Sequence, residues 1–168
     1  GVDGRFVFAG ADLGAGVGGA GLALAARLEG LRVTLVEIDT ALCALAAGNA
    51  LLNGLHDRVE THAADVEVIS SLSAVGLAQG TFNRVLMNPP FHDATKQNVS
   101  PEPRRRLAYA ASPGLLTRWI ASAAWLLKPQ GLLTLIWRAD ELTAVQEALS
   151  AAFGDVAVMP VYPRAEAP

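Results

Sequence analysis

The sequence predicts an α/β fold, a doubly wound and mostly parallel sheet with helices on both faces. Strand-like and helix-like segments alternate along all 168 residues, and no linker or repeat divides them. The strand-like segments are continuous apolar runs, which is typical of strands buried on both faces. A glycine-rich turn follows the first strand, where such sheets bind ligands. We therefore expect a single domain over residues 1–168, forming part of a slightly longer polypeptide.

Each element is delimited by turn and capping residues. The expected strands are residues 5–13, 32–38, 58–64, 82–88, 132–138 and 155–161. The expected helices are residues 17–29, 40–53, 65–77, 113–128 and 140–153. Gly30 and Gly54 end the first two helices, because glycine readily adopts the left-handed conformation found after helix ends. Asp39 or Thr40 is expected to cap the second helix, and Asp140 the last one.

Composition narrows the class of protein. Apolar residues make up 52% of the chain and charged residues 17%, so the chain is not intrinsically disordered. The net charge of −3 means that any RNA contact must come from a local basic patch. Cys43 is the single cysteine, which excludes an internal disulfide and favours a reducing compartment, the cytoplasm. The histidines, His56, His62 and His92, are scattered, so no metal site is expected.

One segment has the length and apolarity of a membrane span. Residues 6–26 carry a single charge, Asp12, and contain a GxxxG pair, Gly14 and Gly18. Six glycines interrupt the segment, however, and a strand, a glycine-rich turn and a helix explain the same residues better. We therefore expect no membrane association, and the chain shows no signal-peptide pattern.

The glycine-rich turn "DLGAGVG" (12–18) begins with an acidic residue at the end of the first strand. Glycines at this position let the backbone approach a ligand closely. The carboxylate of Asp12 would repel a pyrophosphate, but it suits a ligand with an ammonium group. S-adenosyl-L-methionine has an ammonium group and a sulfonium, and it has no phosphate.

Three further acidic residues follow strand ends. Glu37 comes about 20 residues after the glycine turn, where a carboxylate can accept both hydroxyls of a ribose. Asp65, at the end of "AAD", could accept a hydrogen bond from the exocyclic amine of an adenine, or it could cap the next helix. The sequence favours neither interpretation over the other. For Asp39, helix capping is favoured over ligand binding.

The stretch "NPPF" (88–91) ends the fourth strand, next to the first strand in this fold. The amide oxygen of Asn88 and the carbonyl of Pro89 can accept the two N–H groups of a planar exocyclic amine. Such contacts localise the nitrogen lone pair and stabilise the charge that develops on the nitrogen. The rings of Pro89 and Pro90 fix the backbone in advance, and Phe91 offers a face for base stacking. A plain strand-ending turn explains this combination less well.

With these motifs in this order, the chain resembles class I S-adenosylmethionine-dependent N-methyltransferases. The resemblance implies a Rossmann-like methyltransferase fold, with S-adenosyl-L-methionine as cofactor and the NPPF residues as the catalytic motif. The implied cofactor contacts are Asp12, Leu13, Gly14, Gly16, Gly18, Glu37, Ile38, Asp65, Val66 and Asn88.

Two longer stretches are similar to the bacterial tRNA(Val) adenine-N6 methyltransferase family, of the small-domain type. They are "NPPFHDATKQNVSPEPRRRLAYA" (88–110) and "LTRWIASAAWLLKPQGLLTLIWRADEL" (116–142). This resemblance implies methylation of an adenine in a tRNA anticodon loop. That family usually has residues before the first strand and a seventh, antiparallel strand, and neither is visible here. "NPPFH" also occurs in rRNA guanine-N2 methyltransferases, so His92 does not discriminate between the two.

A basic cluster lies in or just after the segment that follows Phe91. The expected contacts with RNA phosphates are Lys96, Arg104, Arg105 and Arg106, with Arg118 nearby. A solvated helix start explains the three consecutive arginines equally well. Residues 92–112 are expected to be mobile without substrate. The three tryptophans, Trp119, Trp125 and Trp137, are expected in the core.

Three other functions compete with adenine methylation. An rRNA guanine-N2 methyltransferase would use the same chemistry. A non-catalytic module that binds S-adenosylmethionine or RNA would have no need of an intact NPPF motif. A NAD-dependent dehydrogenase ranks last, because it would have no use for that motif either.

Overall fold

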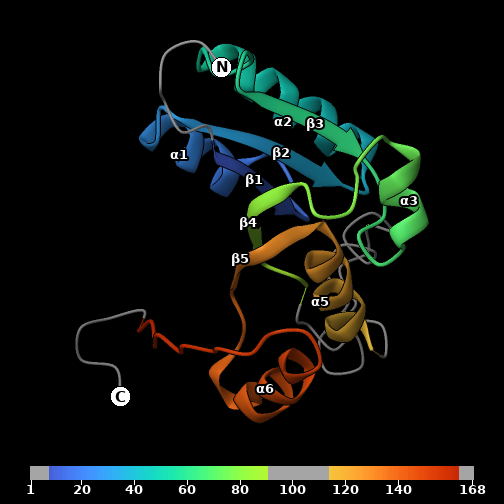
Figure 1. Ribbon diagram of the computed structural model, residues 1–168. Coiled ribbons are helices and arrows are strands. Elements are labelled where there is room, and N and C mark those ends of the chain that lie inside the picture. Colours follow the sequence, from blue (N-terminus) through green and yellow to red (C-terminus); the bar gives the residue numbers. More distant parts are fainter. Residues whose placement is uncertain (1–7, 91–113, 163–168) are drawn as a thin grey trace, which may run out of the picture.

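The protein, seen here in a computed structural model, folds around one parallel five-stranded sheet (Figure 1). The structure describes residues 8–90 and 114–162. The strands are β1 (Phe8–Leu13), β2 (Leu31–Glu37), β3 (Val59–Ala63), β4 (Phe82–Met87) and β5 (Leu127–Leu135). They lie in the order β3-β2-β1-β4-β5, and every neighbouring pair is parallel. The chain therefore moves outward from β1 in one direction and then in the other, as a doubly wound sheet requires.

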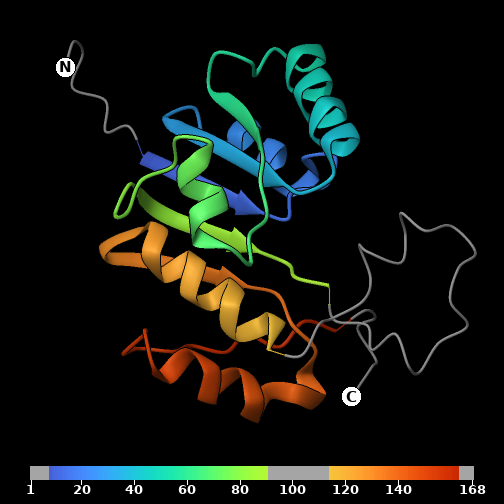
Figure 2. The same ribbon diagram turned by 90° about the vertical axis from the view of Figure 1, so that its right-hand side faces the viewer.

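Helices cover both faces of this sheet. They are α1 (Gly19–Arg27), α2 (Thr40–Leu52), α3 (Ile69–Ala74), α5 (Leu115–Leu126) and α6 (Leu142–Ser150), with a short 3-10 helix η1 (Ala139–Glu141) before α6. Figure 2 shows α3 and α5 in front of the sheet and α1 behind it. Two separate apolar cores result, one between the sheet and α1 and α2, and a larger one that includes α5 and α6. This two-layered core confirms the predicted fold class.

Strand register brings four strand ends to one edge of the sheet. Leu13, the last residue of β1, is paired with Val36 of β2 and with Met87 of β4. Glu37, which ends β2, is paired with Ala63, the last residue of β3. The loops that follow β1, β2, β3 and β4 therefore start side by side at the carboxyl edge, where open α/β sheets bind ligands.

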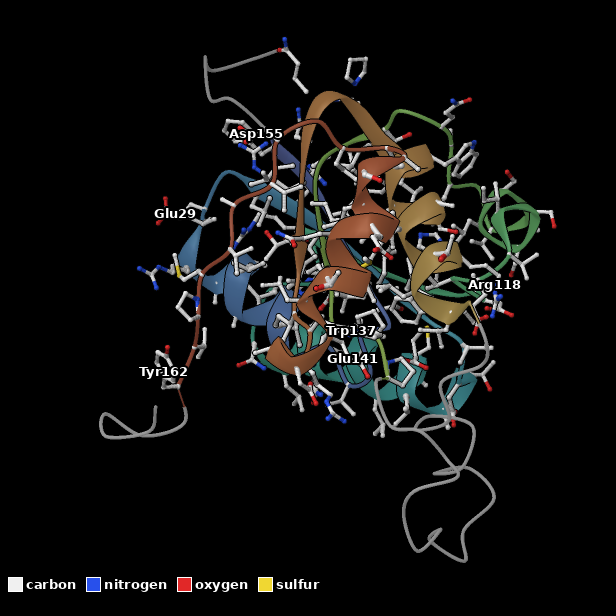
Figure 3. The ribbon with its side chains drawn as sticks, turned by 90° about the horizontal axis from the view of Figure 1, so that it is seen from below. Glu29, Arg118, Trp137, Glu141, Asp155 and Tyr162 are labelled. Carbon is white, nitrogen blue, oxygen red and sulfur yellow. The ribbon has the colours of Figure 1, made fainter. Side chains whose placement is uncertain are left out.

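The predicted sixth strand is wrong. Residues 155–161 belong to no strand, and Figure 3 shows them as an extended tail between the labelled Asp155 and Tyr162. Met159 and Val161 are 85% and 86% exposed, so these two side chains are not packed against the described part of the protein. The alternation of β-branched residues expresses only a local preference, and no pairing with the edge strand β5 is formed by these residues. Pro160 further removes one backbone donor.

Several element boundaries also differ from expectation; helix α3 (Ile69–Ala74), for example, is shorter than the predicted 65–77. Strand β5 begins at Leu127, before the predicted start, and a bulge separates its two paired stretches. Phe82 pairs with Leu127 and Arg84 with Leu132, so β5 carries extra residues between them. Asp140 does not cap α6: it lies within η1, where its carboxylate accepts a hydrogen bond from the Nε of Arg138 (2.9 Å).

Candidate active site

The glycine loop after β1 is tied to the end of β2 by three hydrogen bonds. The N–H groups of Gly14 and Ala15 both donate to the carbonyl of Val36, at 2.9 and 3.0 Å. The N–H of Gly16 donates to Oε2 of Glu37 at 2.8 Å. Gly14, Gly16 and Gly18 have φ angles of 70°, 57° and 86°, which side chains rarely allow. The alternating glycines of the sequence are thus required by the backbone of this loop.

The surroundings of these glycines differ in a way that matters for ligand binding. A Cβ on Gly14 would lie 2.4 Å from the Trp119 ring of α5, and one on Gly18 would lie 3.0 Å from Leu22 and Leu35. A Cβ on Gly16 would meet no atom of the described chain within 4 Å. Gly14 and Gly18 therefore face protein, whereas Gly16 leaves open space where a ligand can approach the backbone.

Asp12 is buried beneath this loop. Its side chain is 4% exposed, and its Oδ2 accepts a hydrogen bond from the N–H of Gly21 in α1 at 2.8 Å. Burial raises the pKa of Asp12 to about 6, and the charge of Glu37 adds to this effect, while the Gly21 hydrogen bond opposes it. Gly21 was not among the predicted site residues, although a Cβ there would lie 2.3 Å from Leu35. The run "GGAG" (18–21) was the available signal.

Glu37 is 8% exposed and has a hydrogen bond on each carboxylate oxygen. Its Oε2 accepts from Gly16, and its Oε1 accepts from the N–H of Asp39 at 3.0 Å. A carboxylate oxygen has two lone pairs, so each oxygen can also accept from a hydroxyl. The next side chain, Ile38, is 60% exposed and provides an apolar surface beside this polar group.

The two other acidic residues are both engaged locally. Asp39 caps α2 as predicted, because its Oδ1 accepts from the N–H groups of Ala41 and Leu42 at 2.8 and 3.3 Å. Asp65 does not cap α3, which begins four residues later. Its Oδ1 instead accepts from the N–H of Glu67 at 2.9 Å, closing a turn after β3. A role of Asp65 toward an adenine amine stays a prediction.

Asn88 follows β4 directly and stands at the same edge as the glycine loop, because Met87 is paired with Leu13. Asn88 is exposed, whereas Pro89 is fully buried. The carbonyl of Met87 accepts from the N–H of Ile136, which ties the end of β4 to the residue after β5. An exposed amide on an anchored backbone is suited to holding a second reactant. Other predicted site residues lie outside the described residues: Phe91, Lys96, Arg104, Arg105 and Arg106.

Arg118 does not stand free as a phosphate contact. Its Nε donates to Oε2 of Glu67 at 2.7 Å, so a carboxylate already neutralises its charge. Figure 3 shows Arg118 on the side of α5 that faces α3. The three tryptophans pack against the larger core as predicted: Trp119 is buried there, and Trp125 and Trp137 are partly buried.

Within residues 8–90 and 114–162, no group of three His, Cys, Asp or Glu side chains is arranged to hold a metal ion. No helix of that same part of the chain is long and apolar enough to cross a membrane.

The carboxyl edge of the sheet fits S-adenosyl-L-methionine. The open backbone at Gly16, the carboxylate of Glu37 and the exposed Ile38 match a ligand that carries a ribose and an apolar base. A parallel sheet in this strand order with a glycine loop after β1 is Rossmann-like, an arrangement that dinucleotide-binding proteins share, and the family match that follows assigns it to the methyltransferases that use S-adenosyl-L-methionine. Residues 5–162 match the family model described as methyltransferase small domain, and the chain belongs to that family.

Known relatives and structures agree with this class. The chain is 35% identical to a release factor glutamine methyltransferase of Chlorobaculum tepidum, over 90% of this chain and 52% of that protein. It is 33% identical to a tRNA1(Val) (adenine(37)-N6)-methyltransferase of Porphyromonas gingivalis, over 78% and 50%. The chain thus spans about half the length of these curated relatives. A crystal structure of a predicted O-methyltransferase from Agrobacterium tumefaciens superposes with a TM-score of 0.67 at 30% identity, covering 88% of this chain and 62% of the other.

Proposed function

We propose that the protein transfers the methyl group of S-adenosyl-L-methionine to the exocyclic N6 amine of an adenine in tRNA. The observation that carries this proposal is the placement of Asn88 beside the glycine loop, on a backbone anchored by the buried Pro89. The similarity to a tRNA1(Val) adenine-N6 methyltransferase supports the choice of substrate. Because tRNA is a cytoplasmic substrate, the proposal includes a cytoplasmic location, and the single thiol Cys43 is compatible with that reducing compartment.

Residues from three loops of the chain would bind different parts of the cofactor. Glu37 would accept the ribose hydroxyls while it keeps its bonds to Gly16 and Asp39. Ile38 would pack against the adenine, with Asp65 accepting from its amine; Val66, predicted beside them, is 4% exposed and its side chain lies in the larger core. The negative charges of Asp12 and Glu37 favour the methionine ammonium at the glycine loop. Bound there, the cofactor supplies an electrophilic methyl group on a sulfonium.

The substrate amine would be held from the β4 side. The amide oxygen of Asn88 and the carbonyl of Pro89 would accept its two N–H groups and localise the nitrogen lone pair. Because both acceptors sit on an anchored backbone, little reorganisation is needed as positive charge develops on nitrogen. Phe91 would stack on the base, which must leave its own stack to enter the site.

Contacts with the anticodon loop would come from the basic residues after the NPPF motif. Lys96, Arg104, Arg105 and Arg106 would bind phosphates, which positions the RNA without reading its sequence. Arg118 is not among these contacts, because Glu67 pairs with it.

A second candidate substrate is the amide nitrogen of a glutamine in a release factor. The 35% identity to a release factor glutamine methyltransferase, over 90% of this chain, favours it. A primary amide is also planar and has two N–H groups, so Asn88 and Pro89 would hold it in the same way. A relative named ribosomal RNA small subunit methyltransferase C, from Aeromonas hydrophila, is 34% identical over 74% of this chain, which keeps the guanine-N2 amine as a further alternative.

The test is mass spectrometry of nucleosides from tRNA and rRNA, comparing a strain that lacks the gene with its parent. Loss of N6-methyladenosine from the tRNA fraction supports the proposal, and restoring the full-length gene should restore it. Unchanged tRNA with less N2-methylguanosine in rRNA would move the substrate to guanine. If both RNA fractions are unchanged and release factors lose methylated glutamine, RNA is not the substrate at all.

A further inference from the structure

Helix α5 holds the turn after β3 through two polar contacts. Ser122 is 0% exposed, and its hydroxyl donates to the carbonyl of Val66 at 2.6 Å. One helical turn earlier, Nε of Arg118 donates to Oε2 of Glu67 at 2.7 Å. Residues four apart lie on one face of a helix, so a single face of α5 binds two consecutive residues of this turn, Val66 and Glu67.

The same turn fixes the carboxylate of Asp65. Oδ1 of Asp65 accepts from the backbone N–H of Glu67 at 2.9 Å, and the N–H of Asp65 donates to the hydroxyl of Ser71 at 3.0 Å. The direction of the carboxylate therefore depends on where the peptide between Val66 and Glu67 lies. That peptide is the one whose two residues α5 holds.

The polar contacts of Ser122 and Arg118 are not needed to pack α5 against the core. Trp119, Ile120, Ala123 and Leu126 already anchor α5 with fully apolar contacts. An alanine in place of Ser122 would fill nearly the same space but would take from the Val66 carbonyl the donor that now orients it. The hydroxyl therefore contributes a defined orientation of the Val66 carbonyl rather than volume.

We propose that Ser122 and Arg118 are positioning residues for recognition of the cofactor's adenine amine. They set the Val66–Glu67 peptide, and through it the carboxylate of Asp65. This inference deepens the proposed function and rests on the proposed contact between Asp65 and that amine.

The consequence is a defined preference between two bases. A carboxylate accepts from the 6-amino group of adenine, but it repels the 6-oxo group of hypoxanthine, which is also an acceptor. A hydrogen bond to a charged group makes this preference roughly tenfold or more in affinity. Loss of the contacts that hold the turn should lower the preference for adenine over hypoxanthine. A general loss of stability should instead weaken the binding of both ligands by the same factor.

The experiment measures dissociation constants of S-adenosylhomocysteine and S-inosylhomocysteine by calorimetry on the full-length protein. Ser122→Ala and Arg118→Met should each lower the preference for the adenine ligand by roughly threefold to tenfold. Arg118→Lys should recover part of it. Matched controls are Ser150→Ala, which removes another hydroxyl bonded to a backbone carbonyl (2.7 Å), and Arg138→Met, which removes another arginine–carboxylate pair. Both controls should leave the preference unchanged.

The Asp65→Asn variant tests the proposed contact of Asp65 with the adenine amine separately from the positioning role of Ser122 and Arg118. If Asp65→Asn abolishes the preference while Ser122→Ala and Arg118→Met leave it at the wild-type value, the inference is wrong and the role of Asp65 stands. If Asp65→Asn leaves the preference unchanged, the proposed contact with the adenine fails, and the inference fails with it. Should Ser122→Ala not fold, Arg118→Met decides the outcome, because the Arg118 side chain is 41% exposed and partly at the surface.

Discussion

Replacing Asp12 with asparagine should stabilise the protein without cofactor, and the gain should depend on pH. The side chain of Asp12 is 4% exposed, and its pKa is raised from 3.8 to about 6, chiefly by burial. A carboxyl with a raised pKa contributes stability below its unfolded pKa and loses that contribution as pH rises through the folded value. Linkage gives a cost of about 3 kcal/mol at pH 7.5 and about 1 kcal/mol at pH 4.5.

Asparagine keeps an oxygen that can accept from Gly21 but carries no charge to desolvate. The net gain at pH 7.5 should be about 1–3 kcal/mol, which is the linkage cost reduced by any difference between an asparagine and a protonated carboxyl at this site. The sharper quantity is the change of this gain with pH, because the difference between asparagine and a protonated carboxyl is the same at both pH values. The advantage of Asp12→Asn over wild type should shrink by about 2 kcal/mol between pH 7.5 and pH 4.5.

Urea unfolding at the two pH values, followed by circular dichroism, measures this difference. Asp57→Asn is the control, since that side chain is 88% exposed and should show no comparable trend. An Asp12→Asn variant that is less stable at pH 7.5, or whose advantage is the same at both pH values, would refute the argument that burial of the charge is costly. Adding S-adenosylmethionine should favour wild type, because its ammonium would compensate the buried carboxylate.

Three further predictions concern the glycine loop and the two reactants. Gly14→Ala should lower the free energy of unfolding by about 2–4 kcal/mol, because the new Cβ would clash with Trp119 and the φ of residue 14 is 70°. Gly16→Ala has open space around it, so it should lower the free energy of unfolding by only about 1–2 kcal/mol and mainly weaken cofactor binding. Thermal unfolding measures both changes. Glu37→Gln should weaken S-adenosylhomocysteine binding roughly tenfold or more by calorimetry, and an unchanged affinity would remove Glu37 from the ribose site. Asn88→Ala should lower the rate of methyl transfer by roughly 100-fold or more with cofactor affinity nearly unchanged, and normal turnover would contradict the mechanism.

The sequence was informative wherever one local pattern decides the structure. Alternating apolar runs and turns predicted β1 through β5 and the helices between them. The glycines at 14, 16 and 18 could be predicted to form a tight turn after β1, because their spacing reflects positive φ angles that the local backbone imposes. Asp39 could be predicted as a helix cap for the same reason, since its partners are the next two residues along the chain.

Prediction failed where a residue's role depends on a distant partner. Residues 155–161 have the composition of a strand, but whether they pair is decided by the rest of the fold. Ser122 is one serine in an alanine-rich helix, and only the structure shows that it bonds a carbonyl 56 positions away. Arg118 follows the basic cluster in the sequence, and its pairing with Glu67 across 51 positions left no local signal.

The contact between Trp119 and the glycine loop gives the protein an intrinsic optical reporter. The indole ring lies directly against Gly14, the residue from which the loop starts, and its Nε1 is buried without a hydrogen-bond partner among the described residues. Indole emission responds to changes in packing and to a newly acquired polar neighbour, and excitation near the red edge of tryptophan absorption avoids the adenine chromophore. Occupation of the loop should therefore change the fluorescence of the unlabelled chain, with Trp119→Phe identifying which of the three tryptophans responds.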